Sequence, residues 1–316
     1  MDQNKLEYQK FCDEEKDLPI FFKDWWLDSV TDPSEWDVVI IKKDTKIIAV
    51  FPYFKVKRHG FSFILQPKLT QFSGPWIKYF KGMKHGVKLS YEKKIFDEII
   101  EKLPDFDHMS VNFHYSVENW LPFYWKGYKQ TTKYTYLIED LQDVNKVYDN
   151  FHGNIRSDIK KAQKVVTVTP SDNLQKFYEL NSNAFKRQGI DMHYSYEYLR
   201  RMDNIQKANN SRRMTFAVDS VGNVHSAIYI VWDKNSAYYL MSGSDPEYRS
   251  SGATSLLLWE AIQFASTIVN KFDFEGSMIE PIEKFFKGFG TVQKPYFNIS
   301  KTNSFLLNIA RILKLL

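Results

Sequence analysis

The sequence contains a single cysteine, Cys12, among its 316 residues. One cysteine cannot form an intramolecular disulfide or a cysteine-rich metal site, so we expect a reducing compartment. No segment approaches the roughly 18 uninterrupted apolar residues that a membrane-spanning helix needs. The first residues also lack the apolar core of a secretory signal. These absences predict a soluble, cytoplasmic protein.

Metal-binding motifs and strong charge are missing as well. The seven histidines show neither an H-x-x-x-H nor an H-E-x-x-H spacing, so we expect no catalytic metal. The formal net charge of +5 is modest for this length. It does not indicate DNA binding, but it suits an anionic small-molecule partner.

The composition is that of a globular protein, with 43% hydrophobic and 26% charged residues. A chain of 316 residues exceeds the usual size of one compact core, so we expect two domains. Aromatic residues make up 16% of the chain, which suits a large core and aromatic-lined clefts.

The two halves of the sequence repeat one order of elements. Periodicity and turn residues predict a β-hairpin, then a helix, then a strand in each half. The corresponding segments are 36–56 with 213–232, 90–103 with 255–268, and 106–115 with 272–277. Such self-similarity predicts two copies of one α/β unit. We therefore place an N-terminal domain at 1–150 and a C-terminal domain at 151–302.

The last segment, 303–316, is predicted to be an amphipathic helix. Its apolar residues recur on one side, and we expect this side to dock on the protein's own core. Adsorption to a membrane surface, with Arg311 and Lys314 toward the headgroups, is the alternative. A similar pattern predicts an amphipathic helix at 19–30.

The stretch 237–277 is the most informative in the chain. Its pattern predicts a strand, a loop, a helix from about Ser255 and a second strand. The start of a helix exposes unpaired backbone amides at the positive end of its dipole, where a phosphate can bind. Gly252 would let the backbone approach such an anion, and Arg249 would add a charge. The alternative is an ordinary N-cap with a turn glycine.

The segment Arg249-Ser-Ser-Gly-Ala-Thr254 resembles a known motif. GNAT-superfamily acyltransferases hold the pyrophosphate of coenzyme A with a Gln/Arg-x-x-Gly-x-Gly/Ala turn, and Thr254 departs from its last, small position. The run 272–290, with Phe-x-Gly-Ser and then Lys-Gly-Phe-Gly, is similar to the BioF2-like, Fem-related branch (methicillin resistance factor-like).

This resemblance implies a fold and a donor site. The implied fold is α/β (α+β), with two tandem GNAT-like domains, each a mixed, mostly antiparallel sheet flanked by helices. Two parallel strands of the fold splay apart and admit the thioester arm of an acyl-CoA. The donor-binding candidates are Met241, Gly243, Arg249, Ser250, Ser251, Gly252, Ala253 and Thr254.

Acyl transfer to an amine needs a base, an oxyanion donor and an acid for the thiolate. Glu275 is the first candidate base, because it lies at the end of the strand that faces the donor strand. If it is buried against Phe272 and Phe274, its pKa would rise toward the useful range; the alternative is a strand-end carboxylate in water. Asp245 and Glu247, just past the donor strand, are second candidates. Backbone amides near Met241 would hold the donor carbonyl if the strand is irregular there. Tyr296 or Ser277 would protonate the thiolate.

Acceptor-binding candidates are mainly basic. Arg156, Lys160 and Lys164 are spaced i, i+4, i+8, which predicts three cations along one helix face. This pattern fits either a solvated surface or a strip that grips acceptor phosphates, and it resembles an Arg-x-x-Ile-x-Lys-Ala segment of Fem-related proteins. Lys287 and His193 are further candidates. The alternative for Lys287 is a surface lysine whose apolar stem packs between aromatic rings, and for His193 it is an ordinary loop residue.

Three functions remain open. The first is N-acylation of an anionic cell-envelope or polysaccharide precursor, such as a nucleotide-linked amino sugar, from acetyl-CoA or another acyl-CoA. The second, implied by the Fem resemblance, uses aminoacyl-tRNA as donor and a peptidoglycan peptide as acceptor, although no strongly basic tail for tRNA is present. The third is a binding module without turnover.

Overall fold

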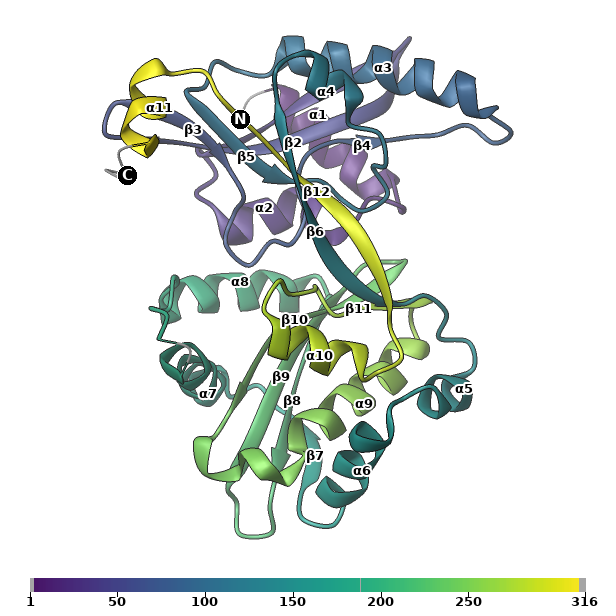
Figure 1. Cartoon of the computed structure of the whole chain (residues 1–316), viewed down its shortest axis with the longest axis vertical. Helices are drawn as coiled ribbons and strands as arrows, with labels where there is room; N and C mark the ends of the chain where they lie inside the picture. Colours follow the sequence, from purple (N-terminus) through teal and green to yellow (C-terminus); the bar gives the residue numbers. More distant parts are fainter. Residues whose placement is uncertain (1–2, 188, 313–316) are drawn as a thin grey trace. The chain divides into compact units, whose positions relative to one another are not determined.

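The computed structural model describes residues 3–187 and 189–312. The chain divides into two compact units. Unit 1 comprises Met1–Lys133 and Pro295–Leu316, and unit 2 comprises Tyr134–Lys294. Each unit is a mixed sheet flanked by helices (Figure 1). The predicted α/β architecture of two similar units is therefore confirmed.

Unit 1 contains both ends of the described chain. Its helices are α1 (Gln3–Glu14), α2 (Asp24–Val30), α3 (His85–Lys102), α4 (Leu121–Trp125) and α11 (Phe305–Ile312), with a 3-10 turn at Ile20–Phe22. Its strands are β1 (Trp36–Lys43), β2 (Lys46–Arg58), β3 (Phe61–Leu65), β4 (Trp76–Ile77) and β5 (His108–Asn112), with most of β12 (Val292–Thr302). The helix predicted at 19–30 is interrupted at Lys23, which is extended and caps α2.

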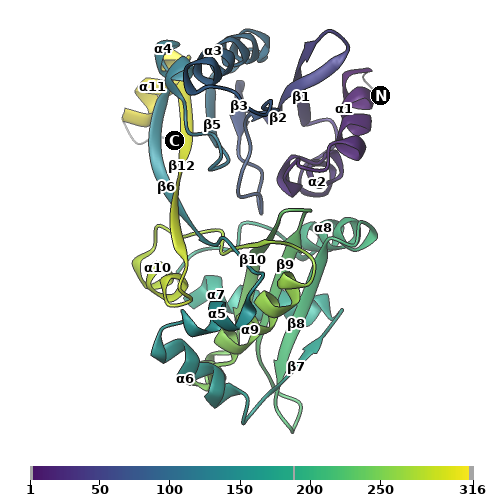
Figure 2. The same cartoon turned by 90° about the vertical axis from the view of Figure 1, so that its right-hand side faces the viewer.

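The sheet of unit 1 has the order β1-β2-β3-β5-β12, with β4 paired to β2. Its pairs are antiparallel, except that β3 and β5 run parallel and are connected through α3. The apolar face of α3, with Ile95, Phe96 and Ile99, packs on one side of the sheet. Figure 2 shows α1 and α2 beside β1.

Unit 2 contains the stretch that resembled a donor site. Its helices are α5 (Val144–Asp149), α6 (Gly153–Ala162), α7 (Leu174–Arg187), α8 (Tyr196–Ala208), α9 (Ala253–Ser266) and α10 (Glu280–Lys287), with the 3-10 turn η2 (Pro246–Ser251). Its strands are β7 (Thr167–Pro170), β8 (Arg212–Val218), β9 (Val224–Trp232), β10 (Ser236–Ser244) and β11 (Lys271–Asp273), with part of β6 (Lys129–Ile138).

The sheet of unit 2 has the order β6-β11-β10-β9-β8-β7. The pairs are antiparallel except for β10 and β11, which run parallel to each other and are connected through α9. In β9, Ile228 and Ile230 belong to the core cluster that includes α6 and α9. The alternate residue Tyr229 contacts Phe177 of α7 instead. The period-2 alternation of the strand therefore separates two helical layers.

The two units repeat the same strand pairings. The order β1-β2-β3-β5 in unit 1 corresponds to β8-β9-β10-β11 in unit 2, with the parallel pair last in both. The two units exchange the strand that follows this parallel pair. In unit 1, β12 from the end of the chain pairs with β5, and in unit 2, β6 from the first half of the chain pairs with β11. The unit boundaries consequently lie at 133/134 and 294/295 rather than at the predicted 150 and 302.

The last described helix, α11, differs from expectation. Leu307 is buried, but Phe305, Leu306 and Ile309 are 75%, 66% and 38% exposed. The expected docking of these three side chains on the core is therefore wrong; the rest of that apolar side lies outside the described residues. Among the helices that the structure describes, none has the length and apolarity to cross a bilayer.

Candidate functional site

The turn before α9 consists of the 3-10 turn η2 and Gly252. Asp245 caps η2 by accepting a hydrogen bond from the Glu247 amide at 2.9 Å, and Gly252 ends it with φ +79°. The first helical bond runs from the Leu256 amide to the Gly252 carbonyl at 3.2 Å, and no side chain of the N-cap residue caps α9. The amides that precede this bond have no partner inside the helix.

Two hydroxyl groups of this turn have structural roles. Ser251 Oγ accepts a hydrogen bond from the Ala253 amide at 3.3 Å. Thr254 Oγ1 lies 2.9 Å from Ser226 Oγ on β9, so the residue that departs from the family motif ties α9 to the sheet. Ser250 is exposed, and its carbonyl accepts a hydrogen bond from Lys161 Nζ of α6.

Gly252 is constrained by more than its positive φ. A Cβ atom at this position would lie 2.3 Å from the Asp158 carbonyl oxygen of α6. The glycine thus permits α6 to pack closely against the turn, which the sequence did not predict.

Two cations lie at the turn, and a third is close enough for its charge to be felt by one of them. Arg249 is exposed on η2, and Lys161 reaches the same turn from α6. Burial lowers the pKa of Arg187, at the end of α7, and the positive charge of Arg249 lowers it further. Two arginines held near each other would repel, and a bound anion would relieve that repulsion. Arg187 and Lys161 were missed, because neither belongs to the Arg-x-x-Gly motif.

The predicted basic strip on α6 is only partly continuous. Arg156 donates to the Asp149 carbonyl at 2.7 Å, and Lys160 is exposed. Helix α6 ends at Ala162, so Lys164 lies beyond it. The prediction of three cations along one helical face is therefore wrong for Lys164. The local reason is a turn, in which the Lys164 amide donates to the Lys161 carbonyl.

The parallel strands β10 and β11 separate soon after they start. Their ladder joins Ser236–Tyr238 to Lys271–Asp273, whereas β10 continues to Ser244. The pairing of β10 with β9 shifts between Tyr239 and Met241, so the strand carries a bulge at Leu240. A strand irregularity is thus present beside Met241, where an oxyanion donor was expected.

Helix α7 packs on the same part of β10. A Cβ atom on Gly243 would lie 2.3 Å from the backbone of Leu180 and Asn181. Asn181 Nδ2 donates to the Ser242 carbonyl at 2.6 Å, and Asn181 Oδ1 accepts from the hydroxyl of buried Tyr194. That hydroxyl also lies 3.3 Å from Met241 Sδ. This network fixes the strand beside the bulge, and no spacing in the sequence indicated it.

Glu275 follows β11 in a strained segment. Its φ is +58°, and Gly276 follows with φ +60°. A Cβ atom on Gly276 would lie 2.0 Å from the Tyr134 carbonyl oxygen, so only glycine fits there. The Glu275 residue is partly exposed as a whole, but its Oε1 is buried and has no hydrogen-bond partner. Burial raises its pKa well above the usual value, and the Asp273 carboxylate raises it further.

The remaining candidates have local contacts. Ser277 Oγ accepts from the Ile279 amide at 3.0 Å, and Lys287 forms an ion pair with Glu283 at 3.5 Å. His193 is exposed between α7 and α8, with its ring against Phe185 and Tyr194. Tyr296 belongs to unit 1, where it packs against Phe72. In the described parts of the chain, no group of three or more His, Cys, Asp or Glu residues suits a metal ion.

Comparison with known proteins agrees with this geometry. Residues 149–277 match the family model described as an acetyltransferase (GNAT) domain, which spans η2, α9, β10 and β11. This segment of the chain is therefore similar in sequence to GNAT-type acetyltransferase domains. The GNAT domain thus includes the turn at 249–254 and ends just after Glu275. The predicted class, an N-acyltransferase, is confirmed at this level.

Solved structures extend the similarity to the whole chain. The crystal structure of FemX aligns with a TM-score of 0.70 at 12% identity, covering 94% of this chain and 96% of FemX. L-PGS from Bacillus licheniformis aligns with a TM-score of 0.55 at 12% identity, covering 99% and 96%. A tandem GNAT protein from the clavulanic acid biosynthesis pathway aligns with a TM-score of 0.50 at 10% identity, covering 85% and 83%.

At these identities the structural similarity concerns the fold. The architecture predicted from the sequence is two tandem GNAT-like units, and the shared fold with FemX and with a tandem GNAT protein confirms it. No curated protein sequence matches the chain.

Proposed function

We propose that the chain transfers an acyl group from an acyl-CoA, in the first instance acetyl-CoA, to an amino group. The acceptor is an anionic cell-envelope or polysaccharide precursor such as a nucleotide-linked amino sugar. The observation that carries the proposal is the cationic turn at the start of α9. There Arg249 lies on the turn, Lys161 donates to the Ser250 carbonyl, and the charge of Arg249 acts on Arg187. A diphosphate bound at this turn would receive both charge and directional hydrogen bonds.

The proposed chemistry follows from the strands beside the turn. The acyl carbonyl lies at the edge of β10 near Met241, where a backbone amide beside the bulge stabilises the tetrahedral oxyanion. Glu275, in its ionised form, takes the proton from the attacking amine. The new C–N bond forms and the C–S bond breaks. The leaving thiolate takes a proton from the Ser277 hydroxyl, and the protonated Glu275 returns a proton to the Ser277 oxygen. The proton removed from the amine thus ends on the thiol, and both side chains regain their starting forms.

A second candidate uses aminoacyl-tRNA as the donor. It is supported by the exposed lysines Lys160, Lys161 and Lys164, which extend the positive surface beyond what one diphosphate needs. Several exposed lysines close together in the chain suit a phosphate backbone. FemX, the structure with the TM-score of 0.70, belongs to the branch for which this donor is implied.

Calorimetry with acetyl-CoA, CoA and bulk tRNA tests the two donors. We expect saturable binding of acetyl-CoA and CoA, weakened at least tenfold by Arg249→Ala through loss of one phosphate ion pair. The matched control is Arg58→Ala, which removes an exposed arginine at the end of β2 in unit 1. Binding of tRNA with no response to CoA would favour the second donor. Donor binding without transfer to any tested amine would instead indicate a binding module.

A further inference from the structure

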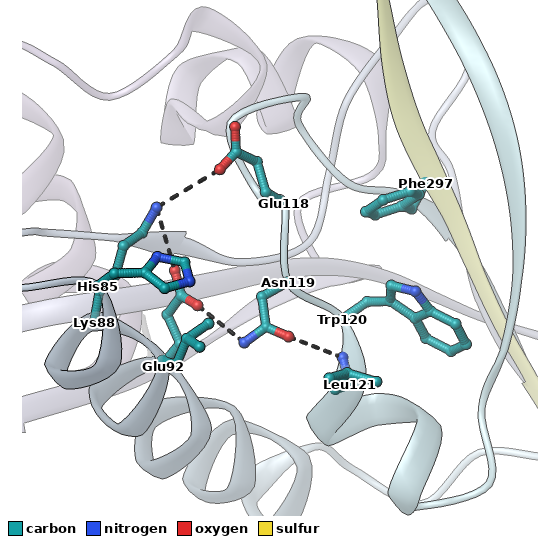
Figure 3. Close-up of a pocket in the computed structure, with 9 residues that line it drawn as sticks. His85, Lys88, Glu92, Glu118, Asn119, Trp120, Leu121 and Phe297 are labelled. Carbon is teal, nitrogen blue, oxygen red and sulfur yellow. Dashed lines mark hydrogen bonds and ion pairs between the residues drawn. The ribbon is translucent and has the colours of Figure 1, made fainter.

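Unit 1 contains a pocket that the proposed reaction does not use. Its volume is about 310 Å³, the size of a small-ligand site. It is formed by the first turns of α3, the segment before α4 and one residue of β12 (Figure 3). The lining residues are His85, Lys88, Leu89, Glu92, Glu118, Asn119, Trp120, Leu121 and Phe297.

One wall of the pocket is polar and pre-organised. Glu92 is 3% exposed, and its carboxylate accepts hydrogen bonds from Tyr79 Oη at 2.8 Å and Asn119 Nδ2 at 3.0 Å. Asn119 Oδ1 accepts from the Leu121 amide at 3.2 Å, which fixes the orientation of the side-chain amide. These bonds hold the carboxylate and the amide in place before any ligand arrives.

The other side of the pocket is aromatic. Trp120 and Phe297 are both partly buried and pack against the hydrophobic core of unit 1. Figure 3 shows these two rings on one side of the pocket, and Lys88, Glu92 and Asn119 on the other. A ligand between them would meet apolar ring surfaces on one side and hydrogen-bonding groups on the other.

The charges of the pocket disfavour a phosphate. Lys88 Nζ lies 3.7 Å from Glu92 and 3.8 Å from Glu118, so one cation faces two carboxylates. The resulting net negative charge repels anions. An ammonium donor, carboxylate acceptors and an amide within a few ångströms of one another suit hydroxyl groups, which both donate and accept hydrogen bonds.

We propose that this pocket binds one saccharide ring, neutral or carrying a free amino group. Its C–H face packs on Trp120, and its hydroxyls bond to Glu118, Asn119 and Lys88. The site recognises the ring by shape and hydroxyl pattern, and it rejects a phosphate on that ring. This binding site goes beyond the proposed transfer reaction and does not depend on it.

Ligand-observed NMR on the full chain tests the site. The probes are glucose, glucosamine, N-acetylglucosamine and glucose 6-phosphate. We expect saturable binding of at least one of the three unphosphorylated sugars with a Kd on the order of millimolar, as for a ligand of this size. Glucose 6-phosphate is expected to bind at least fivefold more weakly than glucose.

Variants separate the site from effects on folding. Trp120→Ala is expected to weaken sugar binding at least tenfold, whereas Trp120→Phe keeps an aromatic surface and most of the affinity. Glu118→Gln neutralises a carboxylate that is 80% exposed. It should reduce the difference in affinity between glucose and glucose 6-phosphate. Glu101→Gln, an exposed residue of α3 outside the pocket, is the control.

Three outcomes would overturn the proposal. One is the absence of saturable binding of any unphosphorylated sugar. Another is tighter binding of glucose 6-phosphate than of glucose. The third is sugar binding that remains unchanged in both Trp120→Ala and Glu118→Gln. Because none of these readouts involves acyl transfer, failure here leaves the donor site untouched.

Discussion

At the scale of single residues, Glu275 combines features that structural residues rarely share. A left-handed backbone at a non-glycine residue costs about 1–3 kcal/mol and persists only where the surroundings enforce it. The surroundings here include Gly276, which packs against the Tyr134 carbonyl. A buried carboxyl oxygen without a partner adds to the cost. Such strain at the end of a strand beside a candidate donor site points to chemistry.

We predict that Glu275→Gln lowers the transfer rate by about 10²–10⁴-fold at pH 8, as expected for loss of a general base. The rate of the unmodified chain should rise with pH, because the raised pKa keeps Glu275 protonated at lower pH. The measurement is thiol release from acetyl-CoA across a pH series. Glu280→Gln, an exposed residue in the first turn of α10, is the control. A variant with unchanged rate and pH profile would remove Glu275 from the mechanism.

The same substitution has a consequence for stability. The folded state keeps a proton on Glu275 that the unfolded state releases above a pKa of about 4.3. The free energy of unfolding therefore falls as pH rises from there through the raised pKa. Glu275→Gln should be the more stable form at pH 8, and the difference should vanish below pH 4. Urea unfolding at the two pH values measures it.

Gly252 illustrates how one position serves the fold as well as the site. We expect Gly252→Ala to destabilise unit 2 by about 3 kcal/mol or more, because the left-handed backbone and the contact with Asp158 both penalise a Cβ. Gly82 has nearly the same φ, +78°, but a Cβ atom there would meet no other atom within 4 Å. Gly82→Ala should therefore cost only about 1 kcal/mol. Equal losses of stability in Gly252→Ala and Gly82→Ala, measured by thermal unfolding, would contradict this account of Gly252. Because a Gly252 variant also disturbs the fold, its loss of donor affinity would not by itself identify a phosphate site.

At the scale of elements, helix α7 holds the part of β10 that is no longer paired with β11. Strand β11 leaves this edge after Tyr238, and Asn181 of α7 then bonds to the Ser242 carbonyl. Asn181 and Tyr194 act as positioning residues, because they hold the bulged strand through hydrogen bonds.

We predict that Asn181→Ala lowers the free energy of unfolding by about 1–3 kcal/mol, because the Ser242 carbonyl and the Tyr194 hydroxyl lose a partner. It should also raise KM for the acyl donor more than it lowers kcat. Asn183→Ala, on the same helix, is the control and should have little effect. The measurements are urea unfolding and steady-state kinetics; a stability loss without any kinetic change would limit Asn181 to a structural role.

At the scale of the whole molecule, the exchange of β6 and β12 makes each unit depend on a distant segment. Strand β12 pairs with β5, and its residue Ile299 is fully buried in unit 1. Strand β6 pairs with β11 in unit 2. A cut at residue 150 or 302 would therefore not isolate either unit.

We predict that residues 1–133 alone fail to fold, because β5 loses its partner strand and the core loses Ile299. The same segment joined by a short linker to residues 295–316 should unfold cooperatively, as should residues 134–294 alone. Thermal unfolding followed by circular dichroism measures this. Cooperative unfolding of 1–133 without β12 would contradict the dependence.

Local sequence patterns by themselves determined the hairpins at 36–56 and 213–232, the helix α9 with its glycine turn, and the repeat of one α/β unit. They did so because alternation, helical spacing and turn residues act over a few neighbours in the chain. Only the tertiary structure decided that Arg187 and Lys161 lie near Arg249, that Asn181 holds β10, and that β6 and β12 are exchanged. These features join residues tens to well over a hundred positions apart, and their side chains are brought together by packing that no local pattern encodes.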